Sequence, residues 1–130
     1  FLIAGAGTEY YVDDNSNTDD QHTPGAVGDN RNSGKSPSAP MASLFALQAA
    51  YDLDPGDVIY VDNGDYAVIR DIELWAEDSG AIGDLLVIQG PTESGKTALL
   101  DRGNTSTGSY VLELVDADGV RVANVSMAGA

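Results

Sequence analysis

Residues 90–97, from Gly90 to Thr97, match the pattern of a phosphate-binding loop in full. Their sequence is Gly-Pro-Thr-Glu-Ser-Gly-Lys-Thr. In such a loop, backbone amides hold the phosphate groups, Lys96 neutralises their charge and Thr97 binds Mg²⁺. The same chemistry requires a helix directly after the loop, with its N-terminus facing the phosphate. Here a short apolar run, residues 98–100, leads into a turn at residues 101–104. We therefore predict a turn between two strands and expect no nucleotide.

A polar run at residues 13–20 offers oxygen ligands for a metal ion. Its alternate positions carry carboxylate or amide side chains, namely Asp13, Asn15, Asn17 and Asp19. Hard oxygens at this spacing are typical of calcium loops. The run is not an EF-hand, because Thr18 stands where the loop requires glycine and Pro24 where it requires a bidentate glutamate. The run is either a calcium site or a solvated surface loop.

No group of residues in the sequence forms a recognisable catalytic set. His22 is the only histidine, and no serine or carboxylate pattern marks it as a base, so we expect a surface histidine. Four charged residues beside the predicted first strands either line a surface groove or, as we expect, occupy turns and solvent faces. They are Asp62, Asp65, Arg70 and Asp71.

Aromatic side chains give a third candidate site. Trp75 and Tyr66, together with Tyr60 and Tyr110, are candidates for a platform that stacks on sugar rings, because aromatic faces suit apolar sugar faces. The alternative is that these rings pack against strands or against a helix.

The composition restricts the partners that the protein can have. The 130 residues include 21 acidic and only 6 basic side chains, so the net charge is −15. Such a chain repels nucleic acid and anionic membranes, but it attracts divalent cations. There is no cysteine, and no apolar run is long enough to span a membrane. The apolar start, Phe1 to Gly5, lacks the charged leader of a signal peptide, so we expect residue 1 to lie inside a longer chain.

The elements that must position these residues follow from local patterns. Residues 1–40 contain a short strand near Tyr10 and a long polar loop. Residues 41–53 contain a helix, with Leu44, Leu47 and Tyr51 on one apolar stripe. Residues 57–130 contain short apolar runs separated by Gly and Asp, which predict strands. These runs start at residues 58, 67, 85, 98, 111 and 120. The starts at 58, 85 and 111 are 27 and 26 residues apart, a spacing in the range of solenoid repeats.

The order of these elements carries a family resemblance. Tyr11-Val12-Asp13 is followed by the polar loop, Pro40, the helix, Asp54-Pro55-Gly56-Asp57-Val58-Ile59-Tyr60-Val61 and then Gly64-Asp65-Tyr66. This succession resembles the start of the pectin-lyase-like β-helix proteins. In that superfamily a short amphipathic helix plugs the N-terminal end of the stacked coils.

The resemblance covers residues 10–127. It implies one all-β domain: a right-handed parallel β-helix (a solenoid) with a short N-terminal capping α-helix and its first coils in residues 57–130. Related segments occur in large secreted and surface proteins of aquatic bacteria, so it also implies an extracellular or cell-surface location.

Two functions are compatible with this start of a β-helix. One is a non-catalytic module for surface structure, adhesion or glycan binding. The other is the N-terminal part of a polysaccharide lyase or glycoside hydrolase whose active site lies on later coils. In both cases we expect further coils or another chain at the C-terminal edge, because a parallel stack leaves backbone groups and apolar side chains exposed at its ends.

Overall fold

A computed structural model of the protein describes residues 7–130, and the apolar start at residues 1–5 lies outside this range. The described residues form short strands, one α-helix and one 3₁₀ turn. In chain order these are β1 (Glu9–Val12), α1 (Leu44–Ala50), β2 (Val58–Val61), β3 (Gly64–Ala67), β4 (Ile72–Trp75), η1 (Ala76–Asp78), β5 (Leu86–Gln89), β6 (Ala98–Asp101), β7 (Leu112–Val115), β8 (Val120–Ala123) and β9 (Val125–Ala128). Among these residues no helix is long and apolar enough to cross a membrane.

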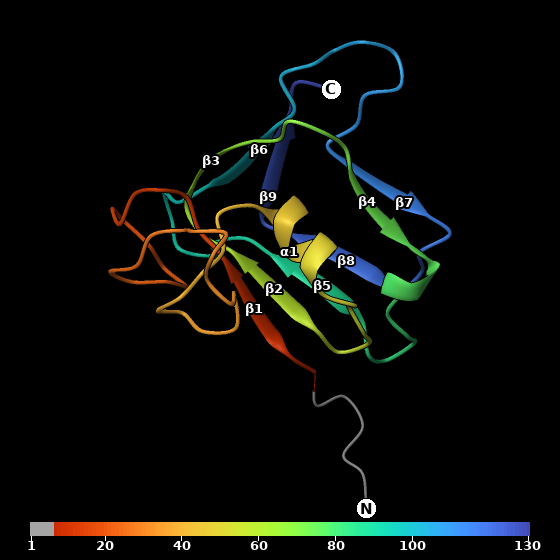
Figure 1. The fold of residues 1–130 in the computed structure, drawn as a ribbon, viewed down its shortest axis with the longest axis horizontal. Coiled ribbons are helices and arrows are strands. Elements are labelled where there is room, and N and C mark those ends of the chain that lie inside the picture. The colour runs from red at the N-terminus through yellow and green to blue at the C-terminus, as the bar shows by residue number, and fades with distance from the viewer. Residues whose placement is uncertain (1–6) are drawn as a thin grey trace, which may run out of the picture.

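The strands form three sheets in which every pair of neighbouring strands is parallel. Sheet A has the order β1-β2-β5-β8, sheet B the order β3-β6-β9 and sheet C the pair β4-β7. From β2 onwards the chain visits sheets A, B and C in turn and then returns to A beside its earlier strand (Figure 1). One passage of the chain through the three sheets is one circuit. The predicted class, mostly parallel β structure with one short helix, is confirmed at this level.

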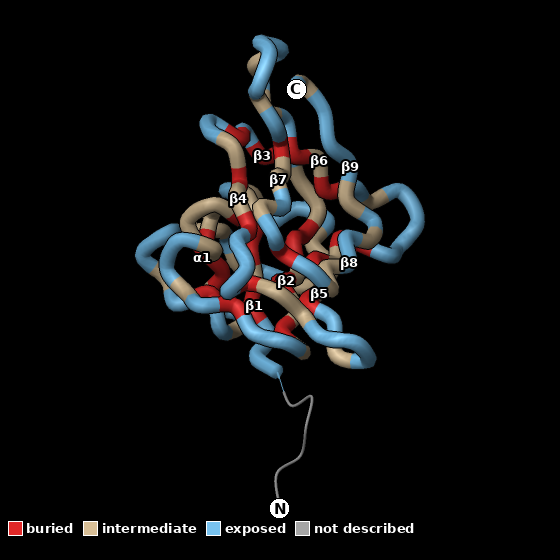
Figure 2. Tube along the Cα trace, turned by 90° about the vertical axis from the view of Figure 1, so that its right-hand side faces the viewer, coloured by how far each residue is buried: buried red, intermediate tan, exposed pale blue. Residues whose placement is uncertain are grey.

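Apolar side chains on alternate strand positions form the core. Ile59 and Ile88 are paired in register in sheet A, and both are buried. Ile72 and Leu74 on β4 and Leu100 on β6 are buried in the same cluster. Residues between these positions are more exposed, as expected for strands with one face on the core. Figure 2 shows the buried positions inside the stack, and exposed backbone along the strands that come last in each sheet.

The helix is shorter than the predicted residues 41–53. It begins at Leu44, because Ser43 caps it by accepting a hydrogen bond from the Ala46 amide at 3.0 Å. Leu44 and Leu47 of the predicted stripe are buried. The helix contacts β4 and lies at the end of the stack where β1 begins sheet A (Figure 2).

The free edge of β1 is covered by the end of the polar loop. The Tyr11 amide donates to the Gly34 carbonyl at 2.7 Å, and the Met41 amide donates to the Tyr11 carbonyl at 3.0 Å. Val12 and Met41 form an isolated parallel bridge. The loop therefore satisfies backbone groups that an open sheet edge would expose.

The strand predictions were wrong in four places. The run 120–125 is two strands, because Asn124 adopts a left-handed conformation (φ 58°) and turns the chain from sheet A into sheet B. The run at 67–69 is the end of β3 and the residues after it. The strand β4 was not predicted. The run at 111 belongs to sheet C and pairs with β4, so it does not continue the series that starts at 58 and 85.

The register predicts opposite outcomes for two neighbouring leucines. Leu86 is fully buried, whereas Leu85 is 39% exposed. Leu86→Ala should lower the free energy of unfolding by about 2–5 kcal/mol, because it leaves a cavity in the core. Leu85→Ala should cost less than about 1 kcal/mol. Denaturant unfolding of both variants measures the difference. A larger loss in Leu85→Ala would mean that β5 is shifted by one residue.

Candidate metal centre

Two aspartates follow neighbouring parallel strands at the same edge of sheet A. Val12 ends β1 and is paired with Val61, which ends β2. Asp13 and Asp62 come directly after these valines, and the Asp62 amide donates to the Val12 carbonyl at 2.9 Å. Both aspartates have a relative exposure of 0%. The parallel register therefore brings two buried carboxylates to one place.

Asp62 is surrounded by backbone donors from the polar loop. Its Oδ2 accepts hydrogen bonds from the amides of His22 and Thr23, each at 2.7 Å, and from the Thr23 hydroxyl at 2.8 Å. Its Oδ1 accepts from the amides of Gln21 at 2.9 Å and Asn63 at 2.7 Å. Burial alone would raise the pKa of Asp62, but these hydrogen bonds outweigh it and hold the pKa below its usual value. Asp62 is therefore a fully satisfied carboxylate that fixes residues 21–23 to the end of β2.

Asp20 completes a cluster of three carboxylates. One side-chain oxygen each from Asp13, Asp20 and Asp62 lies within 4.8 Å of the others. In contrast to Asp62, Asp13 Oδ2 and both carboxylate oxygens of Asp20 are buried and have no hydrogen-bond partner. Unpaired buried polar atoms are costly and require an explanation.

The electrostatics of the cluster are unfavourable without a positive charge. Burial raises the pKa of Asp13 to about 7, and the charges of Asp20 and Asp62 act in the same direction. The pKa of Asp20 is also raised, first by burial and then by the charges of Asp62 and Asp14. The charge of Lys96 acts in the opposite direction and lowers the pKa of Asp20, although burial and the neighbouring carboxylates outweigh it. Lys96 donates to the backbone carbonyl of Asp20 at 3.2 Å, and its ammonium is paired with Glu93 at 2.5 Å.

Only one of the four predicted calcium ligands belongs to this cluster. Asp13 does, whereas Asn15, Asn17 and Asp19 are exposed in the loop. Sequence reasoning missed Asp20. It expected Asp62 on a turn or a solvent face, and Asp62 does lie in the turn between β2 and β3, but it is buried there. A signal was present in the sequence: each strand ends in Tyr-Val and is followed directly by Asp, at residues 11–13 and 60–62.

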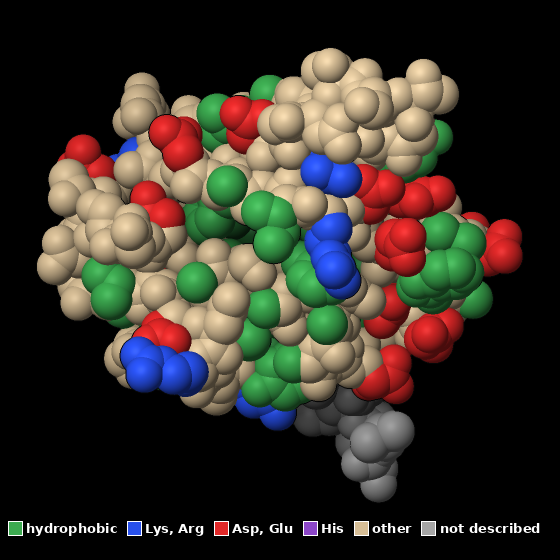
Figure 3. Space-filling model, turned by 45° about the horizontal axis from the view of Figure 1, so that its top comes forward, with side chains coloured by type: hydrophobic (Ala, Val, Ile, Leu, Met, Phe, Trp, Pro, Cys, Tyr) green, Lys and Arg blue, Asp and Glu red, His purple; other side chains and the backbone are tan. Residues whose placement is uncertain are grey.

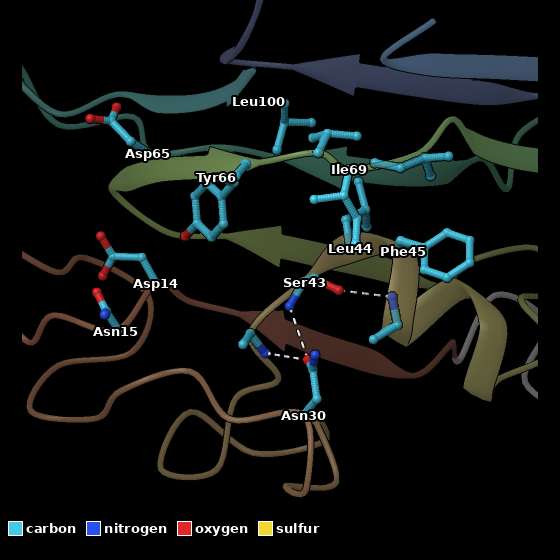
Figure 4. A pocket seen from close by; sticks show the side chains of 15 residues that line it. Asp14, Asn15, Asn30, Ser43, Leu44, Phe45, Asp65, Tyr66, Ile69 and Leu100 are labelled. Carbon is cyan, nitrogen blue, oxygen red and sulfur yellow. Dashed lines mark hydrogen bonds between the residues drawn. The ribbon is translucent and has the colours of Figure 1, made fainter. Parts of the chain in front are cut away.

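A pocket lies beside the cluster, between the polar loop, α1 and β3. Its volume is about 620 Å³, and Asp14 and Asn15 lie on one side of it, opposite Asp65 and Tyr66 of β3 (Figure 4). The side chain of Asn30 accepts a hydrogen bond from the Ser43 amide at 3.1 Å and holds the start of the helix at the pocket. β3 pairs with β6 on one edge, and its other edge has no strand partner. Residues of β3 line this pocket together with residues of the polar loop and α1.

The phosphate-loop pattern forms a turn between β5 and β6, as predicted. The strand β6 begins at Ala98, directly after Thr97, so no helix follows the turn. A Cβ atom on Gly90 would lie 1.9 Å from the Asn124 carbonyl oxygen, so glycine is required there for the close approach of the next circuit. Pairing in the sheets explains the first glycine without any phosphate.

The aromatic candidates do not form one platform. Tyr66 is only 6% exposed, and its hydroxyl donates to the Asp62 carbonyl at 2.8 Å, so it cannot stack on a sugar. Trp75 is 45% exposed at the end of β4. The outer face of sheet A carries a different group, in which the rings of Tyr11 and Tyr60 stack with centroids 5.4 Å apart and His22 lies 4.8 Å from Tyr60.

The other charged candidates make structural contacts. Asp71 is paired with Arg102 at 2.9 Å, and Arg70 lies 5.0 Å from the centre of the Phe45 ring. Asp65 is exposed on β3. Figure 3 shows only a few basic side chains on one face, two of them near one another, while acidic side chains gather along one margin. This face offers no cluster of cations for a phosphate backbone.

Comparison of the chain with protein families, with curated proteins and with solved structures found no match.

The Asp62 contacts predict a loss of stability when the carboxylate becomes an amide. Asp62→Asn places an NH₂ group against backbone amides that need an acceptor, so the free energy of unfolding should fall by about 2–4 kcal/mol. Trypsin should then cut faster after Arg31 and Lys35 in the released loop. Asp65→Asn, at an exposed position, is the matched control. Equal stability of the two variants would contradict the structural role of Asp62.

The turn at residues 90–97 predicts the absence of nucleotide binding. Titration of ATP with Mg²⁺ into the protein should give no binding heat, because no helix follows Thr97 and Lys96 is already paired with Glu93. Lys96→Ala should behave in the same way. ATP binding that is lost in Lys96→Ala would show that the pattern is functional.

Proposed function

We propose that the chain is the capped start of a right-handed parallel β-helix of the pectin-lyase-like type and that it acts as a non-catalytic scaffold. In this proposal each circuit is one coil, and the polar loop and α1 cover the first coil. The assignment is supported by the repeated passage through three parallel sheets and by the covered edge of β1.

The exposed apolar end of the stack carries the proposal. Leu114, Val122 and Met127 lie on the last strand of sheets C, A and B, and they are paired with the buried residues Leu74, Ile88 and Leu100. By this register they occupy core-facing positions, yet they are 48%, 38% and 42% exposed. In a solenoid, core-facing residues stay exposed on the last strand of every sheet when the next coil is missing. The same pattern is present here on all three sheets.

We propose further parallel coils as the occupant of this end. A new strand beside each of β7, β8 and β9 would pair their free backbone groups and bury the three side chains. A helical cap would cover the side chains but would leave the backbone donors of these strands unpaired.

Within the described residues, the position of the carboxylates favours a scaffold role over a lyase or hydrolase site; the alternative of an active site on later coils is separate from these residues. Two of the three clustered aspartates have no exposed surface, and the polar loop holds Asp62 through its backbone amides. A polymer substrate needs carboxylates in an open groove. Surface structure and adhesion need only a stiff, soluble module. An extracellular or surface location belongs to the same proposal, and the net charge of −15 favours the solubility that such a module needs.

The exposed end predicts self-association of residues 1–130. Light scattering during size-exclusion chromatography should show dimers or larger species at high protein concentration. The double variant Val122→Glu and Met127→Glu should be monomeric and should unfold at a similar temperature, because both side chains are partly exposed. Ile82→Glu is the control, because Ile82 is equally apolar and fully exposed in a loop outside the strands. A monomeric parent protein that binds no hydrophobic dye would contradict the open end.

A further inference from the structure

The cluster of Asp13, Asp20 and Asp62 contains more buried negative charge than the described residues compensate. Two of the three carboxylates have unpaired buried oxygens, and Asp13 combines such an oxygen with a relative exposure of 0%. The charge of Lys96 acts on Asp20, but the ion pair of Lys96 is with Glu93, and its hydrogen bond to Asp20 goes to the backbone carbonyl. A buried carboxylate without a partner either takes up a proton or binds a cation.

We propose that Asp13, Asp20 and Asp62 bind one calcium ion that fixes the polar loop to the ends of β1 and β2. This inference does not depend on the proposed scaffold function, because it rests on residues 13–62 alone.

The spacing of the oxygens fits one ion. Ca²⁺ binds oxygen at about 2.3–2.6 Å, so two ligand oxygens on one ion are separated by at most about 5 Å. One carboxylate oxygen from each aspartate lies within 4.8 Å of the other two, so these oxygens are close enough together to bind the same ion. The unpaired atoms are Asp13 Oδ2 and both oxygens of Asp20, which allows one monodentate and one bidentate carboxylate.

Asp62 contributes mainly charge and position. Its two oxygens already accept hydrogen bonds from the loop amides, so it stays ionised beside the ion. Asp13 thus offers one free oxygen and Asp20 offers two, whereas the oxygens of Asp62 are already hydrogen-bonded. Such an irregular set of ligands suits Ca²⁺, which tolerates variable coordination geometry. Mg²⁺ requires near-ideal octahedral geometry and keeps its waters.

The three aspartates come from different parts of the chain. Asp13 follows β1, Asp62 follows β2, and Asp20 lies in the loop that returns to cover the edge of β1. One ion therefore joins two strands to the loop. Its role is structural, because residues 21–23 cover the site and Asp13 and Asp62 have no exposed surface.

The test compares calcium binding by the full chain and by three single variants. After removal of metal with EDTA and dialysis, CaCl₂ is titrated by calorimetry, and the unfolding temperature is measured in CaCl₂ and in NaCl of equal ionic strength. The parent protein should bind about one ion, and its unfolding temperature should rise by roughly 8 °C at a hundredfold excess over Kd.

Asp13→Asn and Asp20→Asn should lose the binding heat and the thermal shift. Both should fold without metal at least as well as the parent, because an amide can donate to the neighbouring carboxylate and removes one charge. Asp19→Asn is the matched control: Asp19 is exposed in the same run and has a φ of 60°, which asparagine tolerates, so calcium binding should be retained.

Three results would overturn the proposal. Absence of both heat and thermal shift in about 10 mM CaCl₂, well above the Kd of weak calcium modules, would mean that the carboxylates hold a proton instead. An equal shift in NaCl would mean that salt only screens the charges. Unchanged binding in Asp20→Asn would place the ion elsewhere, and this variant decides the matter if Asp13→Asn fails to fold.

Discussion

Parallel pairing in register between successive circuits is the constraint on which the other features depend. Ile59 stacks on Ile88, and Ile88 stacks on Val122, because each circuit returns to sheet A beside its predecessor. Since side chains alternate along a strand, a shift of one residue would turn Glu73 and Asp65 towards the core. The same register determines where the turns come close to one another, which is why glycine is needed at Gly90 under the carbonyl of Asn124.

The acidic cluster is a consequence of this register at the end of sheet A. Strands β1 and β2 end at paired valines, so the aspartates that follow them must lie side by side. Repulsion between the two is reduced on one side only, by the loop amides that surround Asp62. Asp13 and Asp20 remain with unpaired oxygens, and the proposed ion would supply the missing charge.

Local patterns in the sequence were sufficient for most of the strands, for the helix and for the turn at residues 90–97, whereas the parallel class was expected from the family resemblance. They failed where the structure depends on contacts between distant residues. β4 was missed because its sequence, Ile-Glu-Leu-Trp, is short and half charged, and its stability comes from pairing with β7. The strand at 120–125 was taken as one because Asn124 gives no stronger turn signal than many other asparagines in the chain. Asp20 could not be linked to Asp62 without knowing the path of the loop.

The hydrogen bonds that hold the polar loop also impose an order on folding. The amides of Gln21, His22 and Thr23 donate to a carboxylate that lies 41, 40 and 39 residues further along the chain. Until β2 has formed, these amides have no partner, and contacts of such long range are slow to form. During synthesis the loop must therefore remain open until Asp62 has emerged. Residues 21–23 are therefore made early but become ordered only after the second strand of sheet A is in place.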